Sequence, residues 1–436
     1  MPEQFIVNPS DSISGITHVP GDKSISHRSL ILLSISEGVG NITGLLESDD
    51  CLATLEIFKM LGVVINRNKD NSYTVHGKGL YGLLKPKNKL NCGNSGTSMR
   101  LLCGLLSAQN FSSELIGDDS LSSRPMERIS SPLTLMGANI KTSSKGTSPI
   151  IIKPSKKISA IEYKMPIDSA QIKSSIILAS LYARDNTSII ENISTRDHTE
   201  NIINFLGGNI ENNNNMVTVN PRNALLSKDI DVPGDISSAM FIIVGCLISK
   251  NSKITLKNIG LNKLRIGGLE ILKMMGAEIE ISNLKNYGPE QVGDINVKSS
   301  KLNGIKIPSN YIASAIDEFP IIFIAASLAE GKTILRNAEE LRHKESDRLY
   351  AMSEGLKKCK IENKLYHDGI DITGGKISGA VIDSFSDHRI AMSFAIAGLV
   401  SKGTMTIMNT ENVSTSFPDF FKLTKDIGLN IDRRVI

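Results

Sequence analysis

Acidic and basic side chains stand close together in the stretch Leu341-Arg-His-Lys-Glu-Ser-Asp-Arg348. Read as the start of a helix, this stretch places Lys344 and Glu345 within four residues of Arg348, so that the three side chains share one face. Such a face can bind an anion and transfer a proton. The plain alternative for a single octapeptide is a solvated helix face with weak local ion pairs. The choice between the two depends on what else the chain carries.

Similar clusters of small polar residues next to a cation recur along the chain. Gly21–Arg28 joins a tight turn to a helix start and so brings backbone amides, hydroxyls and cations together, as an oxyanion site requires. Gly93–Arg100 contains two glycines, which allow a ligand to approach the backbone. Alone, each cluster is equally typical of a capped helix or a turn. Together they favour an anion site, and the others are Ser122–Met126, Ser169–Lys173, Asp317–Pro320 and Ser386–Arg389.

Length and charge limit the possible functions. A chain of 436 residues exceeds a comfortable single core and favours two domains. The 49 basic and 45 acidic side chains give a net charge of +4, without the basic and aromatic tracts of nucleic-acid-binding proteins. Any electropositive site must therefore be local, and we expect no nucleic-acid partner.

The five cysteines are widely spaced and form no Cys-x-x-Cys pair, which is typical of reduced, buried thiols. The N-terminal residues lack the pattern of a signal peptide, and no apolar run approaches the length of a membrane span. We therefore expect a soluble cytoplasmic protein without a membrane partner. Because neither a Walker sequence nor a set of residues at metal-ligand spacing appears, we expect no metal and no cofactor.

One pattern returns along the chain: an apolar helix-like stretch, then a glycine, then a strand containing isoleucine. Successive copies lie about 70 residues apart, with one gap nearer 80, which predicts six repeated α/β units. In each, the glycine suits the left-handed cap that ends a helix. The copies are Leu61–Ile65, Met136–Ile140, Leu206–Ile210 and Met275–Ile279, with weaker ones at Lys357–Ile361 and Ile427–Ile431.

A second repeat relates the two halves of the chain. Val19-Pro-Gly-Asp-Lys-Ser24 recurs as Val232-Pro-Gly-Asp-Ile-Ser237, and a helix is predicted to start after each copy. We therefore predict a first domain of residues 21–234 and a second of residues 1–20 plus 235–436. Each domain would hold three α/β units, and the helices that start after the two copies would point their N-termini towards the inter-domain region.

The motifs together resemble the 5-enolpyruvylshikimate-3-phosphate synthase (3-phosphoshikimate 1-carboxyvinyltransferase) family from Pro20 to Asp419. Four segments look most similar to the bacterial branch that includes glyphosate-tolerant enzymes: Ser169–Ser174, Thr195–Thr199, Leu341–Arg348 and Asp387–Met392. The resemblance implies an α/β (α+β) fold of two similar domains, each with three βαβαββ units in an inside-out α/β barrel. This agrees with the six repeats found above.

The resemblance implies transfer of the enolpyruvyl group of phosphoenolpyruvate to the 5-hydroxyl of shikimate 3-phosphate, on the route to chorismate and the aromatic amino acids. Both substrates are anions, so a cluster of cations must offset their repulsion. The residues implied for shikimate 3-phosphate are Lys23, Ser24, Arg28, Ser169, Ala170, Gln171, Arg196, Asp317 and Lys344. Those implied for phosphoenolpyruvate are Lys23, Gly96, Arg124, Gln171, Arg348 and Arg389.

The implied reaction is an addition followed by an elimination. Glu345 or Lys23 would protonate the methylene carbon of phosphoenolpyruvate, and Asp317 would accept the proton of the attacking hydroxyl. The resemblance implies that the active site lies in a cationic cleft between the two domains. This cleft would close on the anions by hinge motion around Pro20 and Pro233. We expect a monomer whose partners are the two small substrates.

The chain departs from the better-known enteric and plant branch of the family at three positions. Ala170 replaces a serine, Thr415 stands where a lysine precedes the Phe-Pro-Asp motif, and Leu101 replaces a proline. The alternative reading is the sister enzyme that acts on UDP-N-acetylglucosamine, which carries a lysine-asparagine pair and a loop cysteine. Here the pair is Lys23-Ser24, and Gly117–Arg124 contains no cysteine. A non-catalytic anion-binding protein on the same scaffold is the other alternative.

Overall fold

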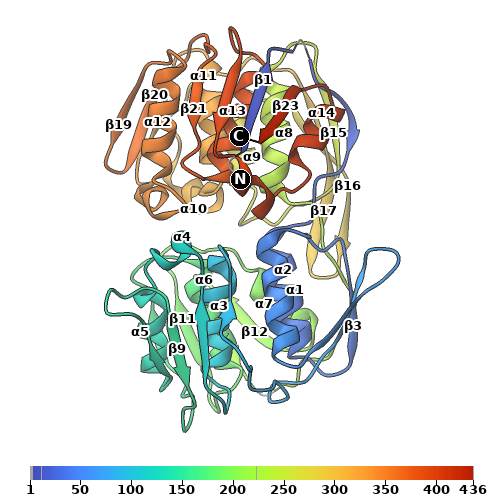
Figure 1. Cartoon of the computed structure of the whole chain (residues 1–436), viewed down its shortest axis with the longest axis vertical. Coiled ribbons are helices and arrows are strands. Elements are labelled where there is room, and N and C mark those ends of the chain that lie inside the picture. The colour runs from blue at the N-terminus through green and yellow to red at the C-terminus, as the bar shows by residue number, and fades with distance from the viewer. Residues whose placement is uncertain (1–2, 11, 222, 436) are drawn as a thin grey trace. The chain divides into compact units, whose positions relative to one another are not determined.

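The computed structural model describes residues 3–10, 12–221 and 223–435. It divides into two compact units, which are described separately here (Figure 1). Unit 1 comprises the described residues of Met1–Pro20, Pro233–Asn286 and Gln291–Ile436. Unit 2 comprises Gly21–Val232 with Tyr287–Glu290. The second division thus falls after Val232, two residues before the boundary predicted from the sequence, and a four-residue turn of the C-terminal half groups with unit 2.

Unit 2 repeats one arrangement of strands and helices, and two of its copies are continuous in the chain. The first continuous copy is β6 (Leu90–Asn91), α3 (Gly96–Leu106), β7 (Ser113–Ile116), α5 (Glu127–Leu135), β8 (Asn139–Lys141) and β9 (Ile150–Lys153). The second is β10 (Glu162–Lys164), α6 (Ala170–Ser180), β11 (Thr187–Ile190), α7 (His198–Phe205), β12 (Asn209–Asn213) and β13 (Met216–Asn220). Both sheets have the order of one parallel pair followed by two antiparallel pairs.

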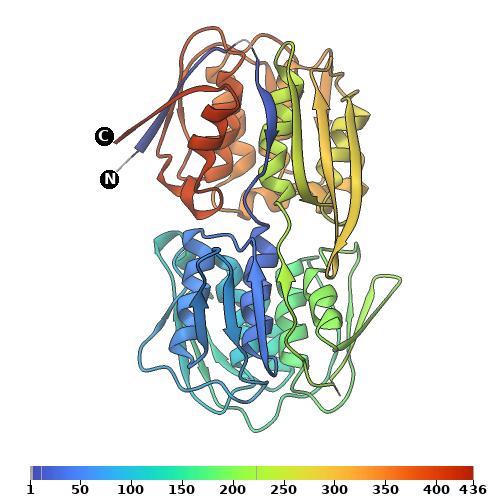
Figure 2. The same cartoon turned by 90° about the vertical axis from the view of Figure 1, so that its right-hand side faces the viewer.

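In the remaining copy of unit 2 the leading strand comes from the far end of the unit. This copy consists of α1 (Lys23–Ser34), β3 (Val39–Thr43), α2 (Asp49–Met60), β4 (Val64–Arg67) and β5 (Tyr73–His76). Its edge strand is β14 (Ile230–Asp231), which pairs in parallel with β3. Figure 2 shows β14 in green beside β3 in blue. The unit therefore closes on itself, because its last strand completes its first repeat.

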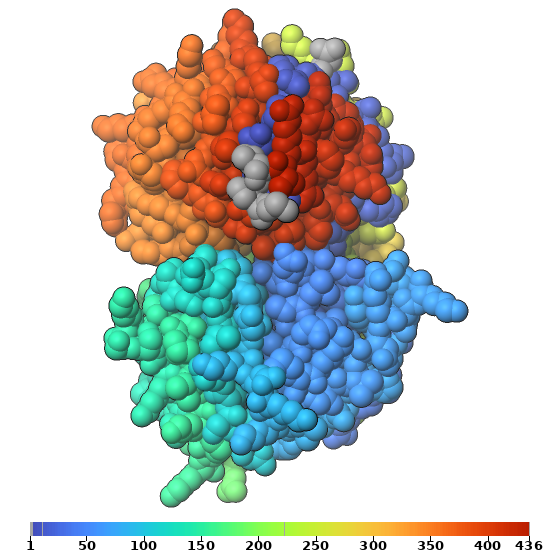
Figure 3. All heavy atoms as spheres, in the orientation of Figure 1, coloured from blue at the N-terminus to red at the C-terminus, as the bar shows by residue number. Residues whose placement is uncertain are grey.

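Unit 1 uses the same arrangement and borrows strands from the N-terminal segment. In its first copy β2 (Ser14–Thr17) pairs in parallel with β15 (Lys253–Gly260), next to β17 (Glu290–Lys298) and β16 (Ile279–Tyr287). In its last copy β1 (Glu3–Asn8) lies between β22 (Met405–Met408) and β23 (Asn430–Val435), with β21 (Val381–Asp383) at the edge. Figure 3 shows this blue N-terminal segment among the red C-terminal residues.

The middle copy of unit 1 has a shorter sheet of β18 (Lys332–Leu335), β20 (Gly369–Thr373) and β19 (Asn363–Tyr366). Isolated parallel bridges, Asn303 to Glu330 and Lys306 to Ile334, lie where the other copies have their leading strand. The six described sheets therefore share one topology, as the six-unit prediction requires.

Each repeat contributes one central helix whose apolar sides are buried. In unit 1 these helices are α8 (Ile236–Ile248), α11 (Phe319–Leu328) and α13 (His388–Gly398), and each of them contacts the other two. Buried apolar residues lie on almost every face of α8 and α11, as expected of helices enclosed by a core. The corresponding helices of unit 2 are α1, α3 and α6. Five of these six helices begin at a cluster singled out in the sequence, and α8 is the exception.

Glycines end the helices of five repeats, as predicted. Gly62, Gly137, Gly207, Gly276 and Gly428 follow α2, α5, α7, α9 (Gly267–Met274) and α14 (Phe420–Asp426), with φ angles of 86°, 94°, 95°, 98° and 115°. These left-handed φ values are the ones that glycine adopts without steric cost.

The register predicted for the fifth copy was wrong by two residues. Helix α12 (Arg348–Lys358) ends later than the Lys357–Ile361 pattern implied, and the left-handed position is Lys360, with a φ of 62°. A lysine at this position gave no glycine signal to align.

Among the described residues, the structure contains no helix with the length and hydrophobicity needed to span a bilayer.

Candidate functional site

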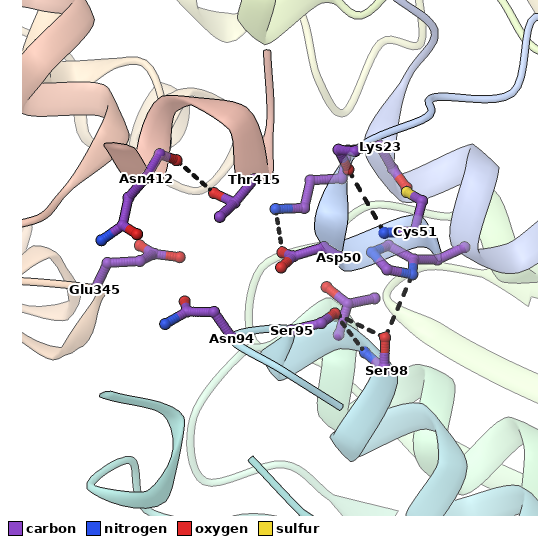
Figure 4. Close-up of polar contacts among 12 residues, drawn as sticks. Lys23, Asp50, Cys51, Asn94, Ser95, Ser98, Glu345, Asn412 and Thr415 are labelled. Atoms are coloured by element: carbon purple, nitrogen blue, oxygen red, sulfur yellow. Dashed lines mark hydrogen bonds and ion pairs between the residues drawn. The ribbon is translucent and has the colours of Figure 1, made fainter. Parts of the chain in front are cut away.

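The start of α1 places Lys23 beside a buried acid. The Asp22 carboxylate caps the helix by accepting a hydrogen bond from the Ile25 amide at 2.8 Å. The Lys23 ammonium forms an ion pair with Asp50, which lies in the first turn of α2 (Figure 4). The side chain of Lys23 is 21% exposed and that of Asp50 is 7% exposed, so the acid orients a cation that still reaches solvent.

Arg28 lies one turn further along α1 and is buried. Its Nε donates to Thr199 Oγ1 at 2.7 Å, its Nη2 to Ser174 Oγ at 2.9 Å and its Nη1 to the carbonyl of Ser24 at 3.0 Å. The guanidinium therefore ties the first turn of α1, which carries Ser24, to α6 and α7.

The start of α3 is shaped by a glycine and an arginine. Ser95 caps the helix by accepting from the Ser98 amide at 3.1 Å. Arg124 Nη2 donates to Asn94 Oδ1 at 2.8 Å, just before the cap. A Cβ added at Gly96 would lie 3.2 Å from Arg124 Nη1, tighter than an ordinary contact. Glycine at this position lets the guanidinium lie against the first turn of the helix.

The start of α6 carries three predicted residues. Ser169 occupies the N-cap position, Ala170 is the first helical residue, and Gln171 follows. Gln171 Oε1 accepts a short hydrogen bond from Arg100, and Gln171 Nε2 donates to Thr97 Oγ1 at 3.0 Å. The amide is therefore held by α3, and Arg100 is a cation that the sequence analysis did not assign to the site.

A buried chain of hydroxyls connects the three helices α1, α2 and α3. His27 Nδ1 lies 2.8 Å from Thr54 Oγ1, which lies 2.5 Å from Ser98 Oγ. Ser98 Oγ donates to Ser95 Oγ at 2.7 Å (Figure 4). Burial, assisted by the positive charges of Lys23 and Arg28, holds the pKa of His27 well below its usual value. The imidazole is therefore neutral and serves as a hydrogen-bonding link rather than a cation.

Arg196 follows a turn that is fixed by buried charges. Lys173 on α6 donates to the carbonyl of Thr195 at 3.0 Å and forms ion pairs with Glu191 and Glu200. Arg196, which is half-buried, is the next residue in the chain. The sequence analysis included Lys173 in a cluster but assigned no function to it.

In unit 1, the stretch from Leu341 to Arg348 is not the start of a helix, and that prediction was wrong. A 3-10 turn covers Glu339–His343, Lys344 is extended, and α12 begins at Arg348. The cause is a competing cap, because Asp347 Oδ1 accepts from the Tyr350 amide at 3.0 Å. Its other oxygen pairs with Arg342 at 2.5 Å.

Arg342 anchors this loop to the neighbouring hairpin. Its Nε and Nη2 donate to the carbonyls of His367 and Tyr366 at 2.6 and 2.7 Å. The loop that carries Lys344 and Glu345 is thereby fixed at both ends, through Arg342 on one side and the helix cap on the other. The two side chains share a cluster with Arg348 although they do not share a helix face.

Arg348 is the centre of that cluster and is 1% exposed. Its Nε lies 2.8 Å from Asp387 Oδ2, its Nη2 2.5 Å from Glu345 Oε2 and its Nη1 3.5 Å from Asp317 Oδ1. Burial alone would lower the pKa of Arg348, but the carboxylates of Asp387 and Glu345 raise it. Burial would likewise raise the pKa of Asp387, and Arg348 holds it below its usual value.

Two further cations surround Asp317. Lys344 Nζ lies 3.5 Å from Asp317 Oδ1, and Arg389 Nη1 donates to the carbonyl of Asp317 at 2.8 Å. Arg389 is in the first turn of α13, where Asp387 Oδ1 accepts from its amide at 2.9 Å. Thr415 donates its hydroxyl to the carbonyl of Asn412 at 2.7 Å (Figure 4).

The predicted residues are thus divided between the two units, and those of unit 1 are in contact with one another. Unit 1 holds Asp317, Lys344, Glu345, Arg348 and Arg389. Unit 2 holds Lys23, Ser24, Arg28, Gly96, Arg124, Ser169, Ala170, Gln171 and Arg196. The sequence analysis missed the acids that hold the cations, Asp50 and Asp387. Asp387 is the N-cap of α13 and Asp50 lies in the first turn of α2, and an aspartate is common at both positions for structural reasons alone.

Comparison with known proteins identifies the family. The model of the EPSP synthase (3-phosphoshikimate 1-carboxyvinyltransferase) family matches residues 7–423. A 3-phosphoshikimate 1-carboxyvinyltransferase of Hydrogenovibrio crunogenus is 48% identical over 435 residues, covering 98% of each chain. One from Legionella pneumophila is 48% identical over 428 residues, covering 98% of this chain and 99% of the relative.

A solved structure of EPSP synthase from Acinetobacter baumannii superposes with a TM-score of 0.90 at 46% identity and covers 100% of both chains. This likeness confirms the predicted fold class of two domains built from repeated α/β units. Because the family match and the relatives extend over almost the whole sequence, the chain belongs to the EPSP synthase (3-phosphoshikimate 1-carboxyvinyltransferase) family.

Proposed function

We propose that this chain transfers the enolpyruvyl group of phosphoenolpyruvate to the 5-hydroxyl of shikimate 3-phosphate, releasing phosphate. Family membership makes it a transferase of the shikimate pathway, which leads to chorismate and the aromatic amino acids. The observation that carries the proposal is the cluster around buried Arg348, which holds Asp317 and Glu345 beside Lys344. Two acids and two cations in one place suit a reaction that moves protons between anions.

The substrates are assigned to residues of both units. Shikimate 3-phosphate would contact Lys23, Ser24, Arg28, Ser169, Ala170, Gln171, Arg196, Asp317 and Lys344. Phosphoenolpyruvate would contact Lys23, Gly96, Arg124, Gln171, Arg348 and Arg389. Arginine suits the planar carboxylate and the phosphate because its guanidinium donates two parallel hydrogen bonds. Each such charge-assisted hydrogen bond contributes about 1.5–3 kcal/mol, so several together overcome the repulsion between the substrates.

The chemistry proceeds in two steps. In the addition, Glu345 or Lys23 gives a proton to the methylene carbon of phosphoenolpyruvate. Asp317 takes the proton of the 5-hydroxyl, whose oxygen forms a bond to the central carbon. In the elimination, the new methyl group returns a proton to the residue that supplied it, the carbon–carbon double bond re-forms, and the bond to the phosphate oxygen breaks. Asp317 gives its proton to the leaving phosphate. General acid–base assistance of this kind contributes about 10² to 10⁴ in rate.

Arg348 supports this division of roles electrostatically. It contacts both Glu345 and Asp317, so a change of charge on one carboxyl alters the field at the other. Asp317 is 16% exposed and Glu345 25% exposed, whereas Arg348 is buried beneath them. The side chains of both acids therefore reach solvent in part, while the buried arginine holds them in position.

A complete site requires residues of both units, and we place it in the cleft between them. The support for this placement is chemical. Neither cluster alone contains both the proposed hydroxyl base, Asp317, and the proposed phosphate ligands Lys23 and Arg124. Closure by hinge motion near Pro20 and Pro233 would bring the clusters together around the anions. A fall in the radius of gyration on adding shikimate 3-phosphate and phosphoenolpyruvate, measured by small-angle X-ray scattering, is the expected result.

The decisive experiment measures phosphate release from phosphoenolpyruvate without added metal. It is run with shikimate 3-phosphate, with UDP-N-acetylglucosamine and without an acceptor. We expect release with shikimate 3-phosphate alone. Release with the nucleotide sugar alone would move the chain to the sister enzyme. If neither acceptor gave release, the non-catalytic reading would hold. Glu345→Ala should lose turnover while still binding shikimate 3-phosphate.

Two finer points complete the proposal. We take a single chain as the active species, because the assigned residues all come from one copy, and light scattering of the active enzyme should give the mass of one chain.

We place the enzyme in the cytoplasm, since its five cysteines are free and buried, as in a reducing compartment. Cell fractionation tests this placement.

A further inference from the structure

Lys173 is a fully buried cation that the proposed mechanism does not use. It lies on α6, three residues after Ala170, and its side chain is 0% exposed. Its ammonium lies 3.0 Å from Glu191 Oε2 and 2.8 Å from Glu200 Oε1, whose side chains are 0% and 4% exposed. Three charged groups are therefore enclosed together in the interior of unit 2.

The same ammonium holds the turn that precedes Arg196. Lys173 Nζ donates to the carbonyl of Thr195 at 3.0 Å. Glu191 Oε1, the oxygen that faces away from Lys173, accepts from the Thr195 amide at 3.0 Å and from the Thr195 hydroxyl. The Glu191 carboxylate thus closes the turn from Glu191 to Thr195, and Lys173 binds this turn to α6. Arg196 leaves this turn directly.

Lys173 also connects this turn to the first turn of α7. Glu200 is the third residue of α7, and its neighbour Thr199 contacts Ser174 of α6 at 2.7 Å. Two successive residues of α6 therefore reach α7. The start of α6, which carries Ser169 and Gln171, and the segment that carries Arg196 form one connected structure through Lys173.

The energetics of burial explain what such a cluster contributes. Burial alone would lower the pKa of Lys173, but the carboxylates of Glu200 and Glu191 raise it, so the lysine stays charged. Burial raises the pKa of Glu200, although Lys173 opposes this. Enclosing charges in this way adds little stability compared with an apolar core, because desolvation offsets the attraction. It does demand one geometry, since any displacement leaves a buried charge without its partner.

We propose that Lys173 is a positioning residue that sets the affinity for the phosphorylated hydroxyl substrate by fixing Arg196 relative to Ser169 and Gln171. Lys173 itself touches no substrate and acts through Arg196. The inference rests on the proposed function, because it assigns these residues to shikimate 3-phosphate. It predicts that the effect of Lys173 is confined to that substrate, since Arg196 is assigned to it alone and Arg124, Arg348 and Arg389 of the phosphoenolpyruvate site lie on other elements. Gln171, which is assigned to both substrates, is held separately by Arg100 and Thr97 of α3.

The test compares Lys173→Met with Lys228→Met as a matched control. Lys228 is also in unit 2, but it is exposed and donates to a backbone carbonyl, that of Phe205, at 2.6 Å. We expect Lys173→Met to raise both the Kd from calorimetry and the KM for shikimate 3-phosphate by about 10- to 100-fold, as small misplacements of a binding group do. The KM for phosphoenolpyruvate and kcat should change by less than about threefold. Lys228→Met should behave like the wild type.

A double-substitution cycle separates positioning from general damage. If Lys173 acts through Arg196, adding Lys173→Met to Arg196→Ala should change the KM for shikimate 3-phosphate by less than about threefold. Equal multiplicative effects in the two backgrounds would overturn the proposal, as would equal rises in both KM values. If the wild type released no phosphate with shikimate 3-phosphate, the proposed function itself would fail. If the wild type were active and Lys173→Met left both KM values unchanged, only the role of Lys173 would fail.

Lys173→Met leaves two buried acids without their cation and can prevent folding. The triple variant Lys173→Met, Glu191→Gln, Glu200→Gln removes all three charges and keeps the side-chain volumes. It should fold, by circular dichroism and thermal unfolding, and still show the selective rise in KM for shikimate 3-phosphate. A triple variant that folds with an unchanged KM, or one that does not fold, would show that the cluster serves stability alone.

Discussion

The same six-residue motif starts α1 and α8, yet the two helix starts differ in chemistry. Both have an aspartate cap, Asp22 in α1 and Asp235 in α8, and both continue with a residue followed by serine. In α1 that residue is Lys23, whose side chain is 21% exposed and paired with Asp50. In α8 it is Ile236, which is 2% exposed.

The start of α8 is filled by contacts within unit 1. Arg265 Nη2 donates to Ser237 Oγ at 2.7 Å and to Asp235 Oδ1 at 3.1 Å, and the Ser237 hydroxyl donates to Glu318. The serine of the motif thus serves a buried network, whereas the corresponding Ser24 is half-exposed beside Lys23. A shared backbone motif therefore supplies a helix start, and the side chains of its first turn decide whether that start binds a ligand or packs.

Lys23→Ile gives α1 the residue of α8 and is expected to have the largest effect. It removes a cation that would contact both substrates and a proposed proton donor. We expect kcat/KM to fall by about 10³-fold or more, since charge-assisted binding and proton transfer are both lost. Lys59→Ala, at an exposed lysine of α2 paired with Glu56, is the control. Activity within about tenfold of the wild type would show that the two helix starts are functionally equivalent.

Ile236→Lys is the reverse exchange and tests the packed end. The lysine would be enclosed where Ile236 is 2% exposed, so a charge would lose its hydration. We expect the chain to be destabilised by about 3 kcal/mol, seen as a lower midpoint of urea unfolding. Ile236→Leu should cost less than about 1.5 kcal/mol. If Ile236→Lys did not lower the stability, the start of α8 would be accessible to water rather than packed.

Gly96→Ala tests how closely the start of α3, a proposed ligand-binding helix start, packs against Arg124. The added Cβ would lie 3.2 Å from Arg124 Nη1, so the guanidinium must move. We expect the KM for phosphoenolpyruvate to rise by about tenfold with little change in the KM for shikimate 3-phosphate. In Gly375→Ala the Cβ would meet Ile361 at an ordinary 3.5 Å, which makes it the control. An unchanged KM in Gly96→Ala would remove Arg124 from the proposed site.

The smallest effect is expected at Asp294, in the first sheet of unit 1. This sheet has longer strands than the first sheet of unit 2. Here β15 and β17 shift register between Leu256 and Ile259, and Asp294 binds Lys257 at 2.7 Å and the Asn258 amide at 3.0 Å. Burial by itself would raise the pKa of Asp294, but hydrogen bonds from Lys257 and Asn283 lower it to about 2.

A carboxyl whose pKa is lower in the folded chain stabilises that chain above its unfolded pKa, which is about 3.9 for aspartate. This contribution is lost as the pH falls towards 2, the pKa of folded Asp294. Asp294→Asn should therefore cost about 1 kcal/mol at neutral pH, and the difference from the wild type should shrink below pH about 4. Equilibrium unfolding at several pH values measures it. A difference that does not depend on pH would contradict the assignment.

Local signals in the sequence predicted much of the fold. The helix-ending glycines are local requirements of the backbone, so five of the six repeats were found in the correct register. The fifth was misplaced because Lys360 adopts a left-handed conformation without being glycine. The helix predicted over Leu341–Arg348 was wrong for two reasons. Asp347 caps α12, which is a local contact. Arg342 is also bound to the carbonyls of His367 and Tyr366, which no local pattern reveals.

The types of the candidate site residues were predictable, but their partners were not. Cations next to small polar residues are visible in the sequence as clusters. The acids that hold them lie on other elements, as Asp50 does for Lys23 and Asp387 for Arg348. The buried contacts of Lys173 with Glu191 and Glu200 likewise depend on how α6 and α7 pack. Periodicity gives the faces of helices, whereas pairs between elements require the tertiary structure.

The position of β1 has a consequence for synthesis of the chain on the ribosome. Glu3–Asn8 pairs with Asn430–Val435 along its whole length and with β22 on its other side. Unit 2 is almost continuous in sequence and has its strands available once Val232 has emerged. Strand β1 must instead wait for its partner until Asn430–Val435 has been translated. We therefore expect unit 2 to fold first during translation and the sheet of unit 1 that contains β1 to be completed later.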